Sequence, residues 1–319
     1  MDCSIVIRAF NEGQHLGRLL EGIRHQTLQD AEIILVDSGS TDETLSIAAS
    51  YGVKIVHIKP EEFTFGRSLN MGVNAATHEL VVIASAHVYP IYPDWLERLL
   101  EPFSDPAIAL TYGKQRGRPF SGLSKKRPAT KFSEHEIFAR WFPQEANPRQ
   151  NHPFCNNANA AVRRSLWVRH PYNEMLTGLE DLAWARWALT EGHLLAYIPA
   201  AEIIHVHSET PRGVYNRYRR EAMAFKHIYP EAHFNLYDFF RMSAGNIFND
   251  LWHATQQKKL LSSFASIFWF RCCQFWGTYK GYRQSLEWNW QLRQTFYYPR
   301  GIEADQSPTR DVEPIRYNK

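Results

Sequence analysis

Short runs of aliphatic residues alternate with amphipathic segments along the first hundred residues. We predict four strands from these runs, at residues 4–10, 31–37, 53–58 and 79–85. Between the first two runs, Leu16, Leu19, Leu20 and Ile23 recur at the spacing of one helix face. Strands that alternate with helices through short connections predict a mostly parallel sheet with helices on both faces.

Candidate capping residues mark where the first helices begin and end. Asn11 is expected to cap the first helix, and Ser40 or Thr41 the second, which Gly52 would end. A third helix is expected around residues 67–76, before the fourth strand.

Polar residues follow three of the four predicted strands. They are Arg8, Asn11 and Glu12 after the first, residues 37–42 after the second, and Ser85 and His87 after the fourth. Because the carboxyl ends of parallel strands meet at one edge of a sheet, we expect these groups to converge on one cleft. Capping and helix-dipole roles explain Asn11, Ser40, Thr41 and Asp42 equally well.

The ends of two predicted strands indicate a functional role more strongly than the other ends do. Asp37 ends four consecutive aliphatic residues, where a carboxylate without a partner would be costly, and this favours a role toward a ligand. Residues 81–90, VVIASAHVYP, show a buried strand that ends on His87. The composition of that strand gives no structural reason for the histidine.

The pattern changes after about residue 111. Residues 114–131 are basic and rich in Gly, Pro and Ser, typical either of a loop that closes over a phosphate-bearing ligand or of a solvated surface loop. Glu180 and Asp181 begin a helix that Gly192 ends, and strand-like segments follow at 194–199 and 202–207. In the second segment, His205 and His207 point to the same side at period two.

Aromatic residues gather in the C-terminal part of the chain, from Phe234 to Tyr298, where they alternate with Arg and Lys. This composition favours contact with the surface of an anionic membrane, and a homodimer interface is the alternative. The longest apolar run there, FASIFWF, stops at Arg271, so no stretch is long enough to span a bilayer.

Composition and charge narrow the class of protein. With 319 residues, of which 44% are hydrophobic, the chain can bury a large core. Lys plus Arg exceed Asp plus Glu by 36 − 33 = 3, which is too little to imply a nucleic-acid partner. Four cysteines without C-x-x-C spacing, and no secretory leader, favour free thiols and a cytoplasmic location.

Six segments in this order resemble the inverting glycosyltransferases of family 2, which have the GT-A fold. The segments are SIVIRAFNE, ILVDSGSTDET, FGRSLNMGVNAA, SAHVYPIYPDWLERLLEPF, NNANAAVRRSLW and GLEDLAWA. Each is a weak motif, and the ordered set is specific. The segments DSGSTD and EEFTFGRSLNMG are similar in sequence to the bacterial rhamnosyltransferase-like and surface-polysaccharide branch of the family.

The resemblance assigns roles to single positions. It implies that the nucleotide-diphospho-sugar donor binds Ala9, Asn11, Glu12, Asp37, Arg67, Asn70 and Ser85. Asp181 matches the catalytic base, and Glu180 would support it. Acceptor hydroxyls would bind Asn156, Asn157 and Asn159. The resemblance also divides the chain into a GT-A catalytic domain, residues 1–210, and a C-terminal helical extension, residues 211–319.

The chain departs from the family at the exit of the fourth strand. Relatives carry Asp-x-Asp or a variant there, whose last carboxylate binds a divalent cation, whereas this chain has Ser85, Ala86 and His87. His87 could ligate a metal together with His205 or His207, could contact the diphosphate as a bare cation, or could mark an inactive site. We favour a metal site, and imidazole ligands suit Mn²⁺, Fe²⁺ or Zn²⁺ better than Mg²⁺, with Mn²⁺ expected.

The predicted function is transfer of a sugar from a nucleotide-diphospho-sugar to a hydroxyl of a glycan or polyprenyl-linked glycan acceptor in surface polysaccharide synthesis. The location would be the cytoplasm, at the inner face of the membrane. The alternative is a nucleotide-sugar or carbohydrate-binding protein that lost catalysis with its Asp-x-Asp. Retention of Glu180 and Asp181 argues against that alternative. A nucleotidyltransferase is less consistent with the sequence, which has no phosphate-cradling glycine-rich loop near its start.

Overall fold

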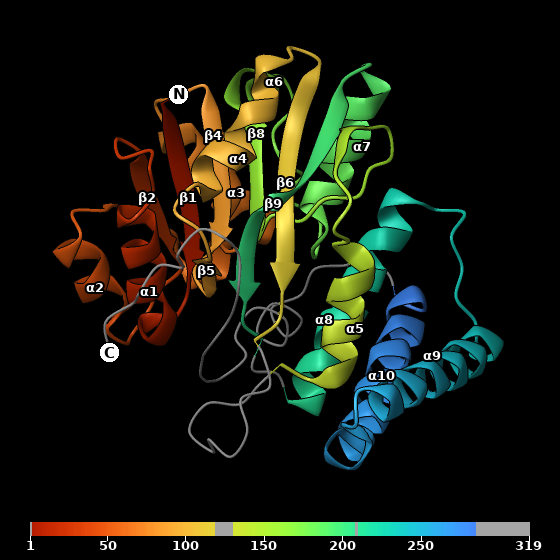
Figure 1. The fold of residues 1–319 in the computed structure, drawn as a ribbon. Helices are drawn as coiled ribbons and strands as arrows, with labels where there is room; N and C mark the ends of the chain where they lie inside the picture. The colour runs from red at the N-terminus through yellow and green to blue at the C-terminus, as the bar shows by residue number, and fades with distance from the viewer. Residues whose placement is uncertain (1, 119–129, 208–209, 285–319) are drawn as a thin grey trace.

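The structure is a computed structural model, and it describes residues 2–118, 130–207 and 210–284. The described residues form one mixed sheet with helices on both faces and a further helical layer at one end (Figure 1). The strands are β1 Cys3–Ala9, β2 Glu32–Asp37, β3 Lys54–His57, β4 Leu80–Ser85, β5 Val88–Pro90, β6 Ile108–Arg116, β7 Asn147–Gln150, β8 Asn159–Arg163 and β9 Leu194–His205. The helices are α1 Gly13–Arg24, α2 Thr44–Ser50, α3 Phe65–Ala75, α4 Trp95–Leu100, α5 Phe132–Trp141, α6 Arg164–Arg169, α7 Glu180–Thr190, α8 Pro211–Ile228, α9 Leu236–Gln256 and α10 Leu260–Tyr282.

The first four strands form the parallel sheet that the sequence predicts. The strand order is β3-β2-β1-β4-β8-β6-β9-β5, and β7 pairs with β9. Strands β1, β2, β3 and β4 run parallel, with Ala9 opposite Asp37 and Arg8 opposite Ser85. The strand exits therefore lie side by side, and the polar residues after them share one edge of the sheet.

The second half of the sheet is mixed. Strands β4 and β8, β8 and β6, and β9 with both β5 and β7 pair antiparallel, whereas β6 and β9 pair parallel. The two strand segments predicted at 194–199 and 202–207 are instead one strand, β9, with a register shift against β6 after Gly113. A Cβ atom at Gly113 would lie 2.1 Å from the carbonyl oxygen of Ala201, so this close approach requires glycine.

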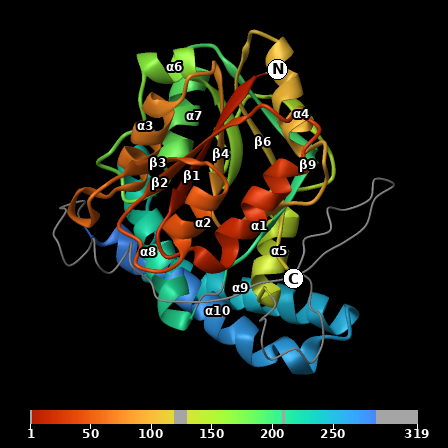
Figure 2. The same cartoon turned by 90° about the vertical axis from the view of Figure 1, so that its left-hand side faces the viewer.

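Helices cover both faces of the sheet, as predicted (Figure 2). On one face, α1, α2 and α4 pack through aliphatic residues such as Leu16 and Leu99, all from the positions that the helical period marks. On the other face, α3, α6 and α7 bury Leu69, Trp167 and Trp184. The sheet is therefore fixed from both sides, and its carboxyl edge remains available for polar side chains.

A layer of helices lies beyond this edge, formed by α5, α8, α9 and α10 (Figure 1). Helix α10 lies close against α8. This close approach requires glycine at position 277, because a Cβ atom there would lie 2.4 Å from the carbonyl oxygen of Tyr215. Helix α5 also belongs to this layer through Ile137, which packs with Phe270 of α10. The division of the chain at residue 210 stays a prediction, and α5 shows that residues before it take part in the helical layer.

The predicted caps of the first two helices are wrong. Helix α1 begins after Glu12 and α2 after Glu43, and neither has a capping hydrogen bond from the predicted residue. The side chain of Asn11 instead accepts a hydrogen bond from the Thr41 amide (2.8 Å), and Ser40 Oγ accepts one from the Asn11 amide (2.9 Å). These residues join the loops after β1 and β2, since a loop partner satisfies the same polar atoms as a helix amide would.

Other predictions concern the C-terminal region, the cysteines and the basic segment. Within the described residues, no helix is long and apolar enough to cross a bilayer. All four cysteines are free thiols, as predicted. Most of the basic segment, residues 119–129, and the end of the aromatic segment, residues 285–298, lie outside the described residues.

Candidate active site

Pairing between β5 and β9 places His87 beside the other two predicted metal ligands. Val88 is opposite His205 in this antiparallel pair, and the Val206 amide donates to the carbonyl oxygen of His87 (3.2 Å). The imidazole ring centroid of His87 lies 5.1 Å from that of His205 and 5.8 Å from that of His207. Nitrogen atoms of the three rings lie within 4.8 Å of one another, so all three can reach one ion.

Each of the three histidines is held through its Nδ1 atom by a different side chain. His87 Nδ1 lies 2.7 Å from Glu12 Oε1, His205 Nδ1 lies 2.8 Å from Gln115 Oε1, and His207 Nδ1 lies 2.8 Å from Glu134 Oε1. An oxygen acceptor at Nδ1 fixes the ring and places its proton there. With the proton at Nδ1, Nε2 is the ring nitrogen that can bind a metal, which is the usual arrangement of histidine ligands.

His205 is the most buried member of the cluster. Its side chain is 5% exposed, and its Nε2 atom has no hydrogen-bond partner among the described residues. Burial, followed by the nearby charges of His207, His87 and Arg217, holds the pKa of His205 well below its ordinary value. A neutral imidazole with a buried lone pair and no partner is the state that a metal ligand requires.

Glu134 connects this cluster to helix α5. Its carboxylate accepts from Arg217 Nη2 (2.8 Å) as well as from His207. Burial alone would raise the pKa of Glu134, but the charges of His207 and Arg217 hold it at about 2. Glu134 is therefore a carboxylate, and it favours the Nδ1-protonated form of His207.

Asp181 lies in the first turn of α7, at the same end of the sheet. Its Oδ2 accepts from the Asn157 amide (2.9 Å) and its Oδ1 from the Leu182 amide (2.8 Å). Burial, followed by the charge of Glu180, raises the pKa of Asp181 to about 7, against the opposing effects of these two amides and of Arg8. A carboxyl group whose pKa is near neutral is suited to accept a proton.

Glu180 and the residue before it shape this turn. Arg8 Nη1 lies 3.4 Å from Glu180 Oε1, so the exit of β1 contacts the start of α7. The guanidinium of Arg8 also lies 4.7 Å from the ring centre of Phe65. Leu179 has a φ of 56°, which non-glycine residues rarely adopt, and such strain concentrates at functional sites.

The three asparagines predicted to bind the acceptor differ in their environment. Asn159 bonds Trp95 Nε1 (2.9 Å), the Ala201 carbonyl (2.8 Å) and the Lys114 carbonyl (3.2 Å), so its carboxamide is used within the fold. Asn156 Oδ1 accepts from the Ala158 amide (3.0 Å). Asn157 is 3% exposed, and neither atom of its carboxamide has a hydrogen-bond partner among the described residues.

Tyr172 is a candidate that sequence reasoning missed. It is 2% exposed, and its hydroxyl has no hydrogen-bond partner among the described residues. Burial and the charges of Cys155, Asp181 and Glu180 raise its pKa well above the ordinary value. Nothing in the sequence around Tyr172 distinguishes it from other tyrosines, because its relation to Asp181 arises only from folding. Gln115 and Glu134 were missed for the same reason.

The predicted donor residues of the β2 exit are satisfied within their own loop. Asp37 is 1% exposed, and its carboxylate accepts from the amides of Gly39 (3.0 Å) and Ser40 (3.2 Å). The buried carboxylate therefore does have partners, so burial no longer argues for a ligand. The carbonyl oxygen of Ala9 accepts from the Ser38 amide (3.1 Å) and so holds the same loop.

Among the other predicted donor residues, Asn70 is also used within the fold. Its carboxamide bonds Trp167 Nε1 and both the amide and the carbonyl of Tyr172. Arg67 is 42% exposed and lies 3.5 Å from Glu174, so it can turn toward a ligand. Ser85 ends β4 with a long backbone contact to Ala158 (3.5 Å). The donor-binding roles of all seven predicted residues stay predictions.

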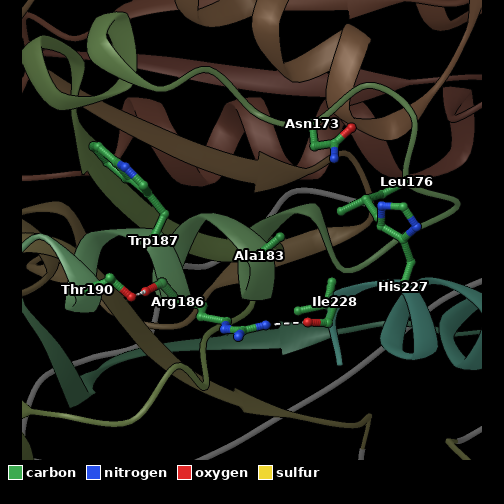
Figure 3. Close-up of a pocket in the computed structure, with 8 residues that line it drawn as sticks. All are labelled: Asn173, Leu176, Ala183, Arg186, Trp187, Thr190, His227 and Ile228. Atoms are coloured by element: carbon green, nitrogen blue, oxygen red, sulfur yellow. Dashed lines mark hydrogen bonds between the residues drawn. The ribbon is translucent and has the colours of Figure 1, made fainter. Parts of the chain in front are cut away.

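Two cavities lie near these elements, and one of them adjoins the histidine cluster. That cavity, of about 900 Å³, is lined by Gln115, the partner of His205, and by Phe138 and Glu202 among others. The other, of about 290 Å³, lies along α7, where Trp187, Arg186 and His227 line it (Figure 3). In that cavity Arg186 donates to the Ile228 carbonyl. None of the predicted site residues lines it, so it is not part of the candidate site.

Comparison with known proteins decides the family. The sequence model of glycosyl transferase family 2 matches residues 4–168, or 165 of the 319 residues. The chain belongs to glycosyl transferase family 2. The resemblance read from the six segments is therefore confirmed, and the matched range includes the exits of β1, β2 and β4 together with His87 and Asn157.

Two relatives come from the O-antigen branch. The chain is 26% identical over 234 residues to O-antigen chain rhamnosyltransferase RfbN of Salmonella typhimurium, covering 68% of this chain and 70% of the relative. It is 27% identical over 220 residues to O-antigen chain rhamnosyltransferase WbaN of Salmonella anatum, covering 67% and 69%.

Solved structures confirm the GT-A fold. Mannosyltransferase PcManGT from Pyrobaculum calidifontis, solved with GDP-Man and Mn²⁺, has a TM-score of 0.56 at 18% identity, over 88% of this chain and 84% of that one. S. aureus TarS 1-349, solved with UDP-GlcNAc, has a TM-score of 0.52 at 15% identity, over 94% and 93%. Identities this low show a shared fold and no more.

Proposed function

We propose that this glycosyltransferase moves a sugar from a nucleotide-diphospho-sugar to a hydroxyl of a glycan acceptor, with inversion, during surface polysaccharide synthesis. The observation that carries the proposal is the hydrogen bond from the backbone amide of Asn157 to the carboxylate of Asp181, whose pKa is raised to about 7. The carboxamide of the same Asn157 is buried and has no partner among the described residues. A proton acceptor and an unused hydrogen-bonding group lie side by side, as transfer to a hydroxyl requires.

In the proposed reaction, the acceptor oxygen forms a bond to the anomeric carbon while the bond from that carbon to the diphosphate oxygen breaks. The Asp181 carboxylate takes the acceptor proton, and the nucleoside diphosphate leaves with the electron pair of the broken bond. Asn157 would hold the acceptor hydroxyl beside Asp181, and its burial would exclude competing water. A single displacement of this kind inverts the anomeric centre.

We propose that His87, His205 and His207 replace the family's carboxylate as ligands of a divalent cation, expected to be Mn²⁺. The fit rests on the orphaned Nε2 of His205 and on the three oxygen acceptors at the Nδ1 atoms. When bound, such a cation would neutralise charge on the leaving diphosphate. This would explain why a buried strand ends on a histidine.

The relatives support a particular donor and acceptor class. Both are named O-antigen chain rhamnosyltransferases, and we infer from them a deoxyhexose donor, with rhamnose as the first candidate. The acceptor would be a growing glycan, carried on a polyprenyl lipid. The exit of β1, with Arg8 and Glu12, and the exposed Arg67 would face the donor.

A ligand screen tests this proposal. Thermal shifts would be measured with nucleotide-diphospho sugars carrying rhamnose, mannose or N-acetylglucosamine, each with and without Mn²⁺. We expect stabilisation by one sugar nucleotide that increases with Mn²⁺. Stabilisation without any transfer to a glycan acceptor would favour the alternative, a binding protein that lost catalysis.

The substitution His87→Asp separates a metal ligand from a bare cation. A carboxylate restores the family's ligand, so a metal site should survive and shift toward Mg²⁺, which prefers oxygen. An imidazolium that contacts the diphosphate would instead be replaced by a like charge, and activity would be lost. Wild-type activity in excess EDTA, combined with loss on His87→Asp, would contradict the metal proposal.

A further inference from the structure

Helices α9 and α10 expose far more apolar surface than the remainder of the described molecule. Of the twelve large apolar side chains that are exposed in the described residues, nine belong to these two helices. They are Leu236, Tyr237, Phe240, Phe248, Trp252, Leu261, Phe264, Phe268 and Trp276. We call them the hairpin face.

The hairpin face forms a stripe along each helix. Tyr237, Phe240, Phe248 and Trp252 are separated by three, eight and four residues on α9. On α10, Leu261, Phe264, Phe268 and Trp276 are separated by three, four and eight residues. These spacings keep each set on one side of its helix. The two sets are connected through Phe239 of α9, whose ring centre lies 5.3 Å from that of Trp276 and 5.0 Å from that of Phe240.

The largest apolar side chains of α9 face outward. Its fully buried residues are Ser243, Asp250 and Ala254, with Ile247 and Leu251 partly buried beside them, whereas its exposed residues include Phe248 at 72% and Trp252 at 58%. Helix α1 has the opposite arrangement, with four buried aliphatic residues. A water-exposed helix is expected to resemble α1, so α9 is built to meet an apolar phase.

The accessible charges that α9 and α10 themselves carry are mostly positive. Between residues 236 and 284, the acidic side chains are Asp238, in a capping box at the start of α9, and Asp250, which is buried against Arg271. The accessible cations in the same range are Arg241, Lys258, Lys259, Lys280 and Arg283. Lys280 Nζ lies 4.9 Å from the ring centre of Trp276, so cationic and aromatic groups share the surface.

We propose that the hairpin face docks on the surface of an anionic lipid bilayer. Aromatic and aliphatic side chains would enter the boundary between headgroups and acyl chains, and the surrounding cations would contact acidic headgroups. A second copy of this chain fits less well, because a two-fold interface would bring the two surpluses of positive charge together.

Buried polar contacts join helices α9 and α10 to each other and to α5. Arg271 of α10 donates to both Asp250 oxygens (2.7 and 2.8 Å) and contacts the Ser133 carbonyl of α5 (3.5 Å). The next residue of α5, Glu134, holds His207. Docking would therefore hold the histidine cluster in a fixed orientation to the bilayer, toward which a lipid-linked acceptor would be presented. That last consequence rests on the proposed function, whereas the docking itself does not.

Vesicle flotation of the full-length protein tests the proposal. Vesicles would contain phosphatidylcholine alone or phosphatidylcholine mixed with anionic phosphatidylglycerol. We expect binding that is stronger to the anionic vesicles and weakens as salt increases. The double substitution Phe248→Ser with Leu261→Ser, at side chains 72% and 99% exposed, should reduce the partition by roughly tenfold or more.

The matched control removes two exposed apolar side chains elsewhere, Val168→Ser with Met175→Ser, and should bind as the wild type does. Arg241→Gln with Lys258→Gln should weaken binding to anionic vesicles selectively. Thermal melts would show that every variant is folded, and donor-induced stabilisation would report on the active site separately. Wild-type protein that ignores anionic vesicles would overturn the proposal. A dimer that the Phe248 and Leu261 substitutions dissociate, without vesicle binding, would instead assign the face to a second copy.

Discussion

At the exits of β1 and β2 the polar side chains accept hydrogen bonds from backbone amides, whereas several buried polar groups around Asp181 and His205 have no partner among the described residues. Asn11, Ser40 and Asp37 all accept hydrogen bonds from backbone amides of these loops. By contrast, the Asn157 carboxamide and His205 Nε2 are buried and unpartnered among the described residues. Since buried polar groups are normally satisfied, we propose that a ligand completes the second region.

Among the tests of this difference, the substitution Asp181→Asn has the largest expected effect on the rate of sugar transfer. Transfer should fall by on the order of 10²-fold or more, because the general base is lost, while donor binding stays within a few-fold of wild type. Initial rates and donor titrations of the purified variant check this. Glu191 is the residue directly after α7, the helix that carries Asp181. The substitution Glu191→Gln is the control and should leave the transfer rate unchanged. A variant that transfers sugar at the parental rate would show that Asp181 is not the base.

Asn157 and Asn159 form a matched pair, because the Asn157 carboxamide has no partner among the described residues and the Asn159 carboxamide has three. Asn157→Ala removes no hydrogen bond of the side chain within the described residues, so it should cost less than about 1 kcal/mol of stability but lower kcat/KM for the acceptor by roughly tenfold. Asn159→Ala breaks three hydrogen bonds and leaves Trp95 Nε1 unsatisfied, so it should destabilise by about 2–4 kcal/mol.

Denaturant unfolding and acceptor kinetics measure both effects for the two asparagines. The comparison fails if the two variants lose stability equally, or if Asn157→Ala keeps full acceptor kinetics.

Much of this comparison could not be predicted from the sequence. Strands β1 to β4, Gly52 and Gly192 were predictable, because hydrophobic period and glycine conformation are local signals. Gln115 lies 90 positions from His205, and Glu134 lies 73 positions from His207, so no local pattern could connect them. The family resemblance predicted Asp181 and drew attention to His87 at the position of the family's metal ligand. The hydrogen-bond partners of the three histidines come from the residue directly before α1, from β6 and from α5, and only folding brings them together.

The errors in the sequence predictions also have physical causes. Asn11 and Ser40 are good capping residues, but a neighbouring loop competes for the same polar atoms, and it prevails here. Asp37 was expected to need a ligand because an unpaired buried carboxylate is costly. Its own loop supplies amides to it, and a sequence does not show whether a turn will fold back in that way.

Among the predicted changes in transfer, the shift of its pH dependence in a Glu180 variant is the smallest. Asp181 must be ionised to accept a proton, and its pKa is raised to about 7, so kcat/KM should rise with pH up to that region and then level. Glu180→Gln removes a charge that raises this pKa, and the rising limb should move to lower pH. Glu191→Gln should leave the limb in place. An unchanged limb in Glu180→Gln would mean that another group controls it.

Direct metal binding tests the central claim, that three histidines replace the family's carboxylate at the end of β4. Mn²⁺ titration followed by electron paramagnetic resonance should show one tightly bound ion per chain in the wild type. Affinity should fall by about 10–100-fold in Gln115→Leu, which removes only the support of His205, and further in His205→Ala. His25→Ala, at the residue directly after α1, is the control. A wild-type protein that binds no divalent ion, or a His205→Ala variant that binds as tightly as wild type, would contradict the account.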